Sequence, residues 1–389
     1  MNQGKFIFSQ IMDRVPWRRF QTCVDRYHGD RNVQTFMCSD YFRVMAFAQL
    51  TYRESLRDIV ACLNAVPEKM YHMGIRSGIL RNNLSNATKQ RDWRIFADFA
   101  QILIKQAREL YQSDTAPVNI DATVYALDAS TINLCLSLFP WAPFRKRKAA
   151  IKLHTLLNIK GNIPEFILIS DGKMHDVNVL DHMFFQPGAF YVMDRGYLDF
   201  ERLYKIHQAR AFFVTRAKSN TKLTRRCSHA ADKPNGIQCD QTVVLANADT
   251  FATYPEPFRR VRYYDAELDK RFVFITNNMS LPARTIADLY RSRWQVELFF
   301  KWIKQHLRIK TFYGISENAV KSQIWIAVSV YLIVAILKKE LGLSQSLYQI
   351  LQIFSLTQFE KTPVFTMFQN KFNNFQNSGH HNQLTLFDL

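Results

Sequence analysis

The stretch from Tyr290 to Lys304, YRSRWQVELFFKWIK, combines side chains that are suited to hold a metal ion and a phosphate. On a helix, with about 100° per residue, four of its polar residues form one narrow stripe. These are Tyr290, Arg293, Glu297 and Lys304, with Lys301 beside them. The opposite side is apolar, with Val296, Phe299, Phe300, Ile303 and Leu307. Glu297 could bind a divalent metal ion while the basic side chains bind phosphate oxygens. The alternative is that the stripe is only the solvated side of a helix, as most charge stripes are.

A metal site needs further acidic residues, and two aspartates close apolar, strand-like runs upstream. Asp128 ends the apolar part of Val124–Ala129 (VYALDA), and Asp194 ends Phe190–Asp194 (FYVMD). Acids at strand ends are carried by rigid backbone and stand at the sheet edge where α/β proteins bind ligands. Each aspartate alone is more often a turn residue, but the pair, followed by the Glu297 helix, favours catalysis.

The runs between these acids predict an α/β core with the order strand, strand, strand, helix, strand, helix, strand. After the Asp128 strand come Lys152–Ile159 and Glu165–Ser170 around the turn Lys160-Gly161-Asn162, a helix capped by Asp176, the Asp194 strand, a helix over Leu198–Ala209 and the strand Phe212–Ala217. The two runs joined by Gly161 and Asn162 are typical of a β-hairpin.

A β-rich insertion is predicted at 219–285, between the last core strand and the Glu297 helix. Its strand-like pieces are Thr242–Leu245, Arg259–Tyr264 and Arg271–Thr276. The runs RRVRYY and KRF alternate cations with aromatic rings, which suits a surface along a nucleic acid backbone. An edge sheet with arginines that extend to solvent is the equally acceptable alternative.

Helical spacing of apolar residues predicts an all-helical N-terminal domain. Within it, SLRDIVACLNAVPEKMYHMGI and RNNLSNATKQRD suggest two short helices split by a turn, with Ser85 placed to cap or present the second. This could be a DNA-binding helix-turn-helix or an ordinary basic helical bundle. Two apolar segments, Ala319–Leu341 and Leu343–Phe354, predict C-terminal helices that pack on the catalytic core, followed by a polar, flexible tail.

Composition favours a polyanionic partner. The 389-residue chain is 48% hydrophobic, carries a formal net charge of +18 and has a pI of about 9.7. The N-terminal sequence contains no long apolar run, and the apolar segment Ile324–Leu337 is shorter than a membrane span of about 20 residues, so we expect no membrane partner. Six cysteines without a CxxC pair suggest reduced thiols, and we expect a cytoplasmic, nucleoid-associated protein that binds DNA.

The acidic motifs resemble those of DDE transposases of the IS4 type, which are enzymes of bacterial insertion sequences. The resemblance rests on YALDAS around Asp128, VMDRGY around Asp194 and the signature Tyr-x2-Arg-x3-Glu-x6-Lys. The signature is satisfied in full by Tyr290, Arg293, Glu297 and Lys304. The resemblance covers about residues 121–312. The N-terminal helical part is also similar, less distinctively, to the extra domain of one branch of these enzymes.

This resemblance implies a ribonuclease H-like α/β catalytic core. In that case Asp128, Asp194 and Glu297 are catalytic and hold two Mg²⁺ ions, which Mn²⁺ can replace. Tyr290, Arg293 and Lys304 would grip the phosphates of the transposon end, and Lys301, Arg195 and Arg216 are the further cations that we expect to contact DNA. The insertion aromatic that stacks a flipped base in relatives is not identified by the sequence, because Tyr254, Phe258, Tyr263, Tyr264 and Phe272 all compete.

The expected domains follow the chain. They are a helical DNA-binding domain at 1–112, the catalytic core at 120–218 and 286–312, the β-rich insertion at 219–285, C-terminal helices at 313–358 and a flexible tail at 359–389. Within the tail, Gln383, Leu384, Leu386 and Phe387 resemble a peptide that docks on the bacterial sliding clamp.

The implied function is excision and integration of an insertion sequence. Its partners would be double-stranded DNA, as transposon ends and target, and a second copy of the chain in a synaptic homodimer. Two alternatives share the fold. One is a transposase-derived repressor without catalysis, which would not need all three acids. The other is a metal-dependent nuclease or phosphatase, which would not need so much basic surface.

Overall fold

The computed structural model describes residues 4–76, 78–114, 118, 120–146, 148–306 and 312–368. The described residues fall into two compact units. The first comprises the described parts of Met1–Leu110, His306–Gly314 and Asn318–Leu389, and the second comprises those of Tyr111–Gln305 with Ile315–Glu317.

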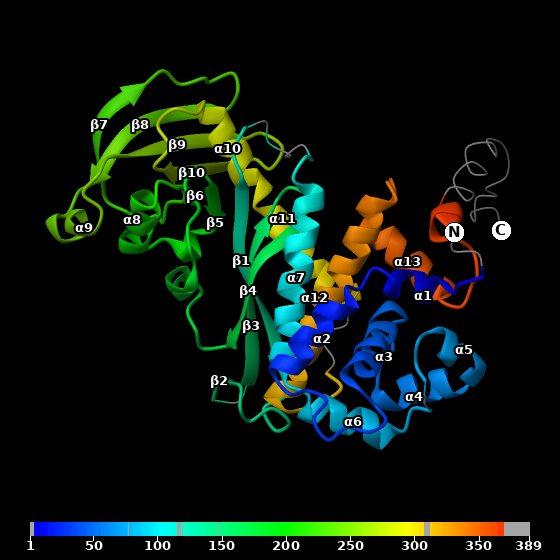
Figure 1. Ribbon diagram of the computed structural model, residues 1–389. Helices are drawn as coiled ribbons and strands as arrows, with labels where there is room; N and C mark the ends of the chain where they lie inside the picture. The colour runs from blue at the N-terminus through cyan, green and yellow to red at the C-terminus, as the bar shows by residue number, and fades with distance from the viewer. Residues whose placement is uncertain are drawn as a thin grey trace, which may run out of the picture. The chain divides into compact units, whose positions relative to one another are not determined.

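The second unit is built on one sheet, in which the described strands follow the order β2-β3-β1-β5-β6-β10-β9-β8-β7, with β4 also paired to β3 (Figure 1). The strands are β1 (Val124–Leu134), β2 (Pro143–Arg145), β3 (Lys148–Asn158), β4 (Ile163–Asp171), β5 (Phe190–Met193), β6 (Phe212–Arg216), β7 (Leu223–His229), β8 (Ile237–Leu245), β9 (Phe258–Asp265) and β10 (Lys270–Thr276). β5 is parallel to β1 and β6, and the other pairs are antiparallel. The path β4-β3-β1-β5-β6 is a mixed sheet consistent with the fold of DDE transposases.

The hairpin of β3 and β4 turns where the sequence predicts it. Gly161 and Asn162 have positive φ values of 69° and 56°. A side chain at Gly161 would collide with the ring of Tyr111, since a Cβ atom there would lie 2.2 Å from it. Glycine is therefore required at this turn for both conformation and space.

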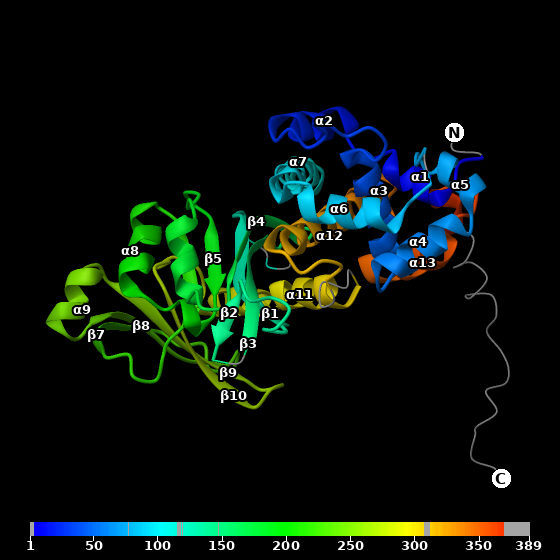
Figure 2. The same cartoon turned by 90° about the horizontal axis from the view of Figure 1, so that it is seen from below.

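Helices cover both faces of this sheet. They are η1 (Asp176–His182), η2 (Arg195–Tyr197), α8 (Phe200–Gln208), α9 (Ala248–Thr253), α10 (Ala283–Ser292) and α11 (Trp294–His306). Leu203 and Ile206 of α8 share one buried cluster with Ile275 of β10, whereas the adjacent Phe274 packs on Tyr290 of α10 with ring centroids 4.7 Å apart. Adjacent strand residues face opposite sides, so α8 and α10 cover opposite faces. Figures 1 and 2 likewise show α8 and α11 on opposite sides of β1 and β5.

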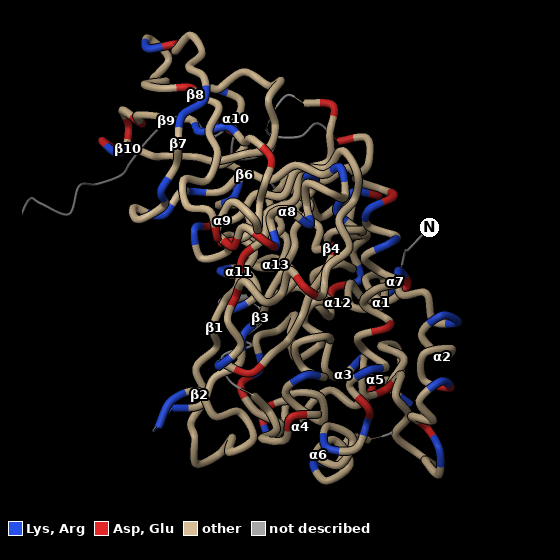
Figure 3. Tube along the Cα trace, turned by 90° about the vertical axis from the view of Figure 1, so that its left-hand side faces the viewer, with Lys and Arg blue, Asp and Glu red and all other residues tan. Residues whose placement is uncertain are grey.

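The insertion strands continue the core sheet. β10 pairs with β6, and β9, β8 and β7 follow in antiparallel order. Figure 3 shows cationic positions along these strands. Arg259 departs from both interpretations of RRVRYY, a DNA-facing run or an edge sheet with arginines that extend to solvent, because it is buried and forms an ion pair with Asp240 at 2.6 Å. Arg262, in contrast, is exposed.

The first unit is helical. Its elements are α1 (Ile7–Met12), α2 (Trp17–Arg26), α3 (Cys38–Leu50), α4 (Leu56–Asn64), α5 (Pro67–His72), α6 (Arg81–Gln90), α7 (Trp93–Tyr111), α12 (Glu317–Glu340) and α13 (Leu347–Thr357). The sequence predicts that the C-terminal helices pack on the catalytic core, but the described part of α12 and α13 belongs to the same compact unit as the N-terminal helices. Apolar periodicity shows that a face is buried and does not show against what.

Helix α12 is the one described helix long and apolar enough to cross a membrane, by length and composition only. Of its apolar window, 94% is buried inside the protein. This burial is that of a core helix, as the sequence predicts.

The tail prediction is wrong for the described residues from 359 to 368. The backbone N–H of Ile7 donates to the Glu360 carbonyl at 2.9 Å, and the N–H of Val364 donates to the Gln10 side chain at 3.0 Å. Val364 and Phe368 are buried. This polar segment is therefore held by the N-terminal helix α1, a long-range contact that local composition does not reveal.

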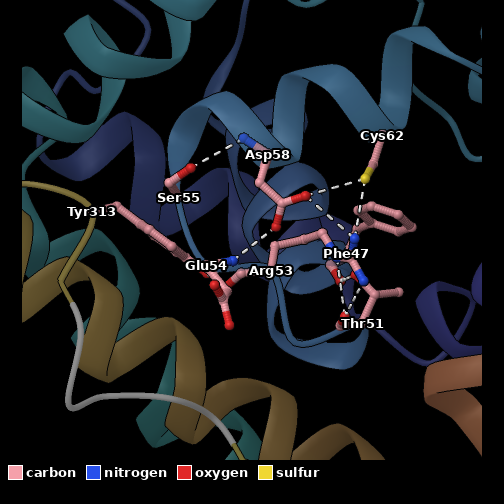
Figure 4. A network of polar contacts seen from close by, with 8 residues as sticks. All are labelled: Phe47, Thr51, Arg53, Glu54, Ser55, Asp58, Cys62 and Tyr313. Carbon is pink, nitrogen blue, oxygen red and sulfur yellow. Dashed lines mark hydrogen bonds and ion pairs between the residues drawn. The ribbon is translucent and has the colours of Figure 1, made fainter.

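The predicted helix-turn-helix region contains three helices, α4, α5 and α6. Ser85 lies inside α6 and Leu80 is the N-cap residue, so Ser85 does not cap this helix. The connection from α3 to α4 is held by Asp58, which accepts from the N–H of Glu54 at 2.9 Å and from Arg53 at 3.3 Å (Figure 4). The Tyr313 hydroxyl donates to the Arg53 carbonyl at 2.7 Å and joins the segment before α12 to this connection.

Candidate active site

Asp128 lies within β1 and not at its end. The strand continues to Leu134, and Asp128 pairs with Thr155 of β3. The neighbouring Leu127 belongs to the cluster under α8, so Asp128 faces the side that α10 and α11 cover. The prediction that β1 stops at this acid is wrong, because the polar residues from Ser130 onward are paired across the antiparallel ladder with β3.

Arg293 connects two of the three predicted acids. Its guanidinium donates to Asp128 Oδ2 at 2.9 Å and to Glu297 Oε1 at 2.5 Å. The sequence predicts a single helix here, whereas α10 ends at Ser292 and α11 begins at Trp294. Arg293 keeps a helical conformation between them, with φ of −54° and ψ of −32°. The junction thus brings together side chains that 165 positions separate along the chain.

Asp194 lies next to this junction. It follows β5 directly and caps η2, and its carboxylate accepts from the N–H of Arg195 at 2.6 Å. The hydroxyl of Tyr290 donates to the same carboxylate oxygen at 3.4 Å. Burial raises the pKa of Tyr290 and the adjacent Arg293 opposes this shift, so the hydroxyl stays protonated at neutral pH.

The charges in the site are unevenly exposed. The Glu297 side chain is 54% exposed, whereas those of Asp128 and Arg293 are 22% and 17% exposed. Burial raises the pKa of Asp128 to about 6, the N–H of Ala129 and Arg293 oppose that shift, and the charges of Glu297 and Asp194 add to it. Burial alone would lower the pKa of Arg293, but Tyr290, Asp128 and Glu297 together raise it, so this guanidinium is charged.

The three acids fit a divalent hard cation by their chemistry. Carboxylate oxygens are the ligands that Mg²⁺ and Mn²⁺ prefer, and Asp128 and Glu297 already approach one positive group, the Arg293 guanidinium. Within the described residues, no group of three His, Cys, Asp or Glu side chains already converges on a metal position. Arg293 instead occupies oxygens of two of the acids, so a metal ion would take over oxygens that the guanidinium now holds.

The other predicted DNA-binding residues are spread around the acids. Lys304 donates to the backbone carbonyl of Thr131 on β1 at 3.0 Å. Lys301 and Arg195 are exposed, and Arg195 directly follows Asp194. Arg216 ends β6, and its guanidinium lies 5.3 Å from the ring centroid of Phe272.

A groove of about 530 Å³ begins at Arg216 and continues along β9 and β10. Its lining combines cations with aromatic rings and one acid: Arg216, Gln238, Tyr264, Asp269, Lys270, Arg271 and Phe272. Of the five aromatics that compete in the sequence, Tyr254, Phe258 and Tyr263 are buried. Tyr264 and Phe272 line the groove and are partly exposed, so burial separates candidates that the sequence leaves equal.

Tyr197 is a residue near the acids to which the sequence reading assigns no role. It is buried, and its hydroxyl forms no hydrogen bond with any described residue. Burial raises the pKa of this hydroxyl, and the charges of Asp128 and Asp194 add to the shift. The signal that could have pointed to it is its place in the run VMDRGY, three residues after Asp194.

Residues 120–333 match the family described as the transposase DDE domain, and residues 3–76 match a domain of unknown function, DUF4372. The protein y4zB of Sinorhizobium fredii, named as a transposase, is 33% identical over 258 residues, which cover 65% of this chain and 70% of that protein. The transposase named for insertion sequence element IS5377 of Geobacillus stearothermophilus is 30% identical over 234 residues, covering 59% of this chain and 61% of that protein.

A third relative is the Synechocystis protein named as a transposase for insertion sequence element IS4SA. It is 26% identical over 267 residues, which cover 67% of this chain and 73% of that protein. The matched domain spans the strands and helices that carry Asp128, Asp194 and Glu297. The chain belongs to the DDE transposase family, and it is an enzyme of DNA cleavage and strand transfer.

Proposed function

We propose that this transposase excises and integrates an insertion sequence of the IS4 type by acting at the element's terminal inverted repeats. The observation that carries the proposal is the junction at Arg293, where β1, α10 and α11 bring Asp128 and Glu297 to one guanidinium. Tyr290, Arg293, Glu297 and Lys304 match the signature of that type, and the names of two relatives refer to insertion sequences.

Asp128, Asp194 and Glu297 would hold two divalent ions, with Mg²⁺ as the natural metal and Mn²⁺ as a substitute. Mg²⁺ keeps several of its waters and needs few protein oxygens, which three carboxylates can supply. Two such ions, when bound, activate a water or 3′-hydroxyl and stabilise the leaving oxygen. The protein's part is to fix the acids on β1, on the end of β5 and on α11, all rigid elements.

The cations around the acids would position the DNA strand. Arg293 and Tyr290 lie beside the carboxylates, and Arg195 and Lys301 are exposed nearby along the same elements. Lys304 donates one hydrogen bond to the Thr131 carbonyl, and its ammonium group has further donors for a phosphate. The groove from Arg216 to Phe272 offers cations and two partly exposed rings, which suits a nucleic acid backbone and an unstacked base.

The helical N-terminal residues, 1–112 in our division, would bind the transposon ends. Helix α6 supports this role, because its exposed face carries only polar and basic side chains: Arg81, Asn82, Ser85, Asn86 and Lys89. Amide and cationic side chains on one helix face are suited to base edges and phosphates of a DNA groove. Two transposon ends call for a homodimer in the synaptic complex.

The C-terminal peptide would add a second partner. Gln383, Leu384, Leu386 and Phe387 lie outside the described residues, and their likeness to a sliding-clamp peptide stays a prediction from the sequence. A pull-down with the bacterial clamp, using the full chain and a chain ending at Asn382, decides it. Equal retention of both chains would contradict clamp binding through this peptide.

Cleavage of a transposon-end duplex tests the assignment of the acids. We expect Asp128→Asn, Asp194→Asn and Glu297→Gln each to abolish strand cleavage in Mg²⁺ while binding of the same duplex persists. Glu201→Gln is the matched control, because this acid is 71% exposed and sits on α8, which covers the other face of the sheet. Cleavage by any of the three variants at the wild-type rate would refute its role. Binding without cleavage by the wild type would instead indicate a repressor.

A further inference from the structure

Arg293 occupies an unusual position for a residue that is expected to contact DNA. Its two terminal nitrogens are used by Asp128 and Glu297, at 2.9 and 2.5 Å. Its Nε atom is buried and has no hydrogen-bond partner among the described residues. Only 17% of the side chain is exposed, so the guanidinium points into the protein at the acids.

The electrostatics of the site explain why a cation is needed there. Asp128 and Glu297 both approach the Arg293 guanidinium, and carboxylates that lie close together repel one another unless a cation lies between them. Without a metal ion, the guanidinium is the positive charge that two of these acids share. A planar group with several donors can serve two carboxylates at once, which a point charge such as an ammonium cannot do in the same way.

We propose that Arg293 is the resident counter-ion of the metal-free site. It holds Asp128 and Glu297 near their working positions before metal arrives, and it releases their oxygens when a divalent ion binds. The released guanidinium then becomes available to a phosphate of the DNA strand. This role makes Arg293 a positioning residue for the metal ligands, and it rests on the proposed function, in which those acids bind metal.

The competing interpretation is that Arg293 is a permanent structural ion pair or only a phosphate ligand. The three roles of Arg293, as a displaced counter-ion, a permanent ion pair or a phosphate ligand, differ in the absence of DNA. A counter-ion that is displaced competes with metal, so its removal tightens metal binding while it destabilises the metal-free protein. A permanent ion pair contributes to stability both with and without metal. A residue that only binds phosphate affects neither the metal affinity nor the stability of the DNA-free protein.

Titration of the DNA-free protein with Mn²⁺ by calorimetry, together with thermal unfolding in EDTA and in Mn²⁺, tests the proposal. We expect Arg293→Gln to bind Mn²⁺ roughly tenfold more tightly than the wild type, because a like charge close to the metal is removed. We also expect a lower Tm in EDTA and a larger rise in Tm when Mn²⁺ is added. Unchanged or weaker Mn²⁺ binding, or an unchanged Tm in EDTA, would overturn the proposal.

Control variants separate this inference from the assignment of the acids. Arg291→Gln removes a neighbouring cation that pairs with Asp265 at 3.1 Å, and it should leave Mn²⁺ affinity unchanged. Asp128→Asn and Glu297→Gln should weaken Mn²⁺ binding. If they bind Mn²⁺ like the wild type, the proposed metal site itself fails. If the two acid variants bind Mn²⁺ more weakly while Arg293→Gln leaves the Mn²⁺ affinity unchanged, only the counter-ion role fails.

A second substitution protects the test against a variant that does not fold. Arg293→Lys keeps the charge but cannot donate to both acids with the same fork. It should therefore bind Mn²⁺ more tightly than the wild type and less tightly than Arg293→Gln. Affinity equal to that of the wild type would contradict the proposal, even if the glutamine variant cannot be purified.

Discussion

At the scale of single residues, the site depends on how one buried carboxyl group is balanced. Asp128 sits in mid-strand with one arginine as its charged partner, and burial raises its pKa to about 6. The carboxyl group therefore keeps its proton up to a higher pH than an exposed aspartate does, and it is ionised at pH 7. Such an imbalance is common at functional sites, where a ligand supplies the missing charge.

This imbalance predicts how stability depends on pH. The folded-state pKa of Asp128 exceeds its ordinary value of 3.8, so its favourable contribution is fully present below about pH 4 and is lost as the pH rises through 6. Asparagine does not ionise, so the Asp128→Asn variant does not lose stability at this position as the pH rises. In EDTA, the free energy of unfolding of the variant relative to the wild type should rise between pH 4 and pH 7, by at most about 3 kcal/mol.

Denaturant unfolding at a series of pH values measures that difference, with Glu201→Gln as an exposed control. A difference that stays constant or falls as the pH rises would show that the burial of Asp128 does not dominate its ionisation.

At the scale of secondary-structure elements, the insertion strands β8 and β9 are joined to each other by a buried ion pair. Arg259 of β9 donates to both carboxylate oxygens of Asp240 on β8, and the two side chains are 8% and 6% exposed. Removing one partner leaves an uncompensated charge in the protein, which is far more costly than losing an exposed pair.

We therefore expect Arg259→Ala to destabilise the protein by roughly 3–5 kcal/mol. Arg262→Ala, on the exposed side of the same strand, should change stability by less than about 0.5 kcal/mol. Urea unfolding of both variants measures this contrast. Equal losses of stability would mean that the Arg259 pair has no special structural role.

The same elements show what the sequence could predict. The hairpin at Gly161, the helix α8 and the order of the core strands follow from local patterns of apolar and turn residues. The extent of β1 beyond Asp128 does not, because its polar residues are held by pairing with β3. Likewise, Arg259 and Arg262 cannot be told apart within RRVRYY. Only the ion pair with Asp240 on β8 gives Arg259 a structural role.

Within the site, spacing on one helix could predict that Glu297 and Arg293 lie together. It could not predict that Arg293 reaches Asp128, because this contact depends on the path of the whole sheet. The packing of 360–368 on α1 was missed for the same reason, since both contacts join distant parts of the chain.

At the scale of the whole molecule, the net charge of +18 favours DNA binding that is strongly salt-dependent. If Arg271 in the groove contacts a phosphate, Arg271→Gln should reduce the slope of log K against log salt by about 0.9. Lys205→Gln, on α8 and paired with Asp181 and Glu201, should leave the slope unchanged. Fluorescence anisotropy with a transposon-end duplex at several salt concentrations measures both slopes, and equal slopes would exclude Arg271 from the DNA surface.

Asp128, Asp194 and Glu297 should bind the metal ions of strand cleavage, and exchange of a carboxylate for a thiolate tests this proposal most directly. Thiolates bind Mn²⁺ better than Mg²⁺. We expect Asp128→Cys, Asp194→Cys and Glu297→Cys to be inactive on a transposon-end duplex in Mg²⁺ and to regain measurable cleavage in Mn²⁺, whereas the wild type cleaves in both. Full activity of any of these variants in Mg²⁺ would contradict the claim.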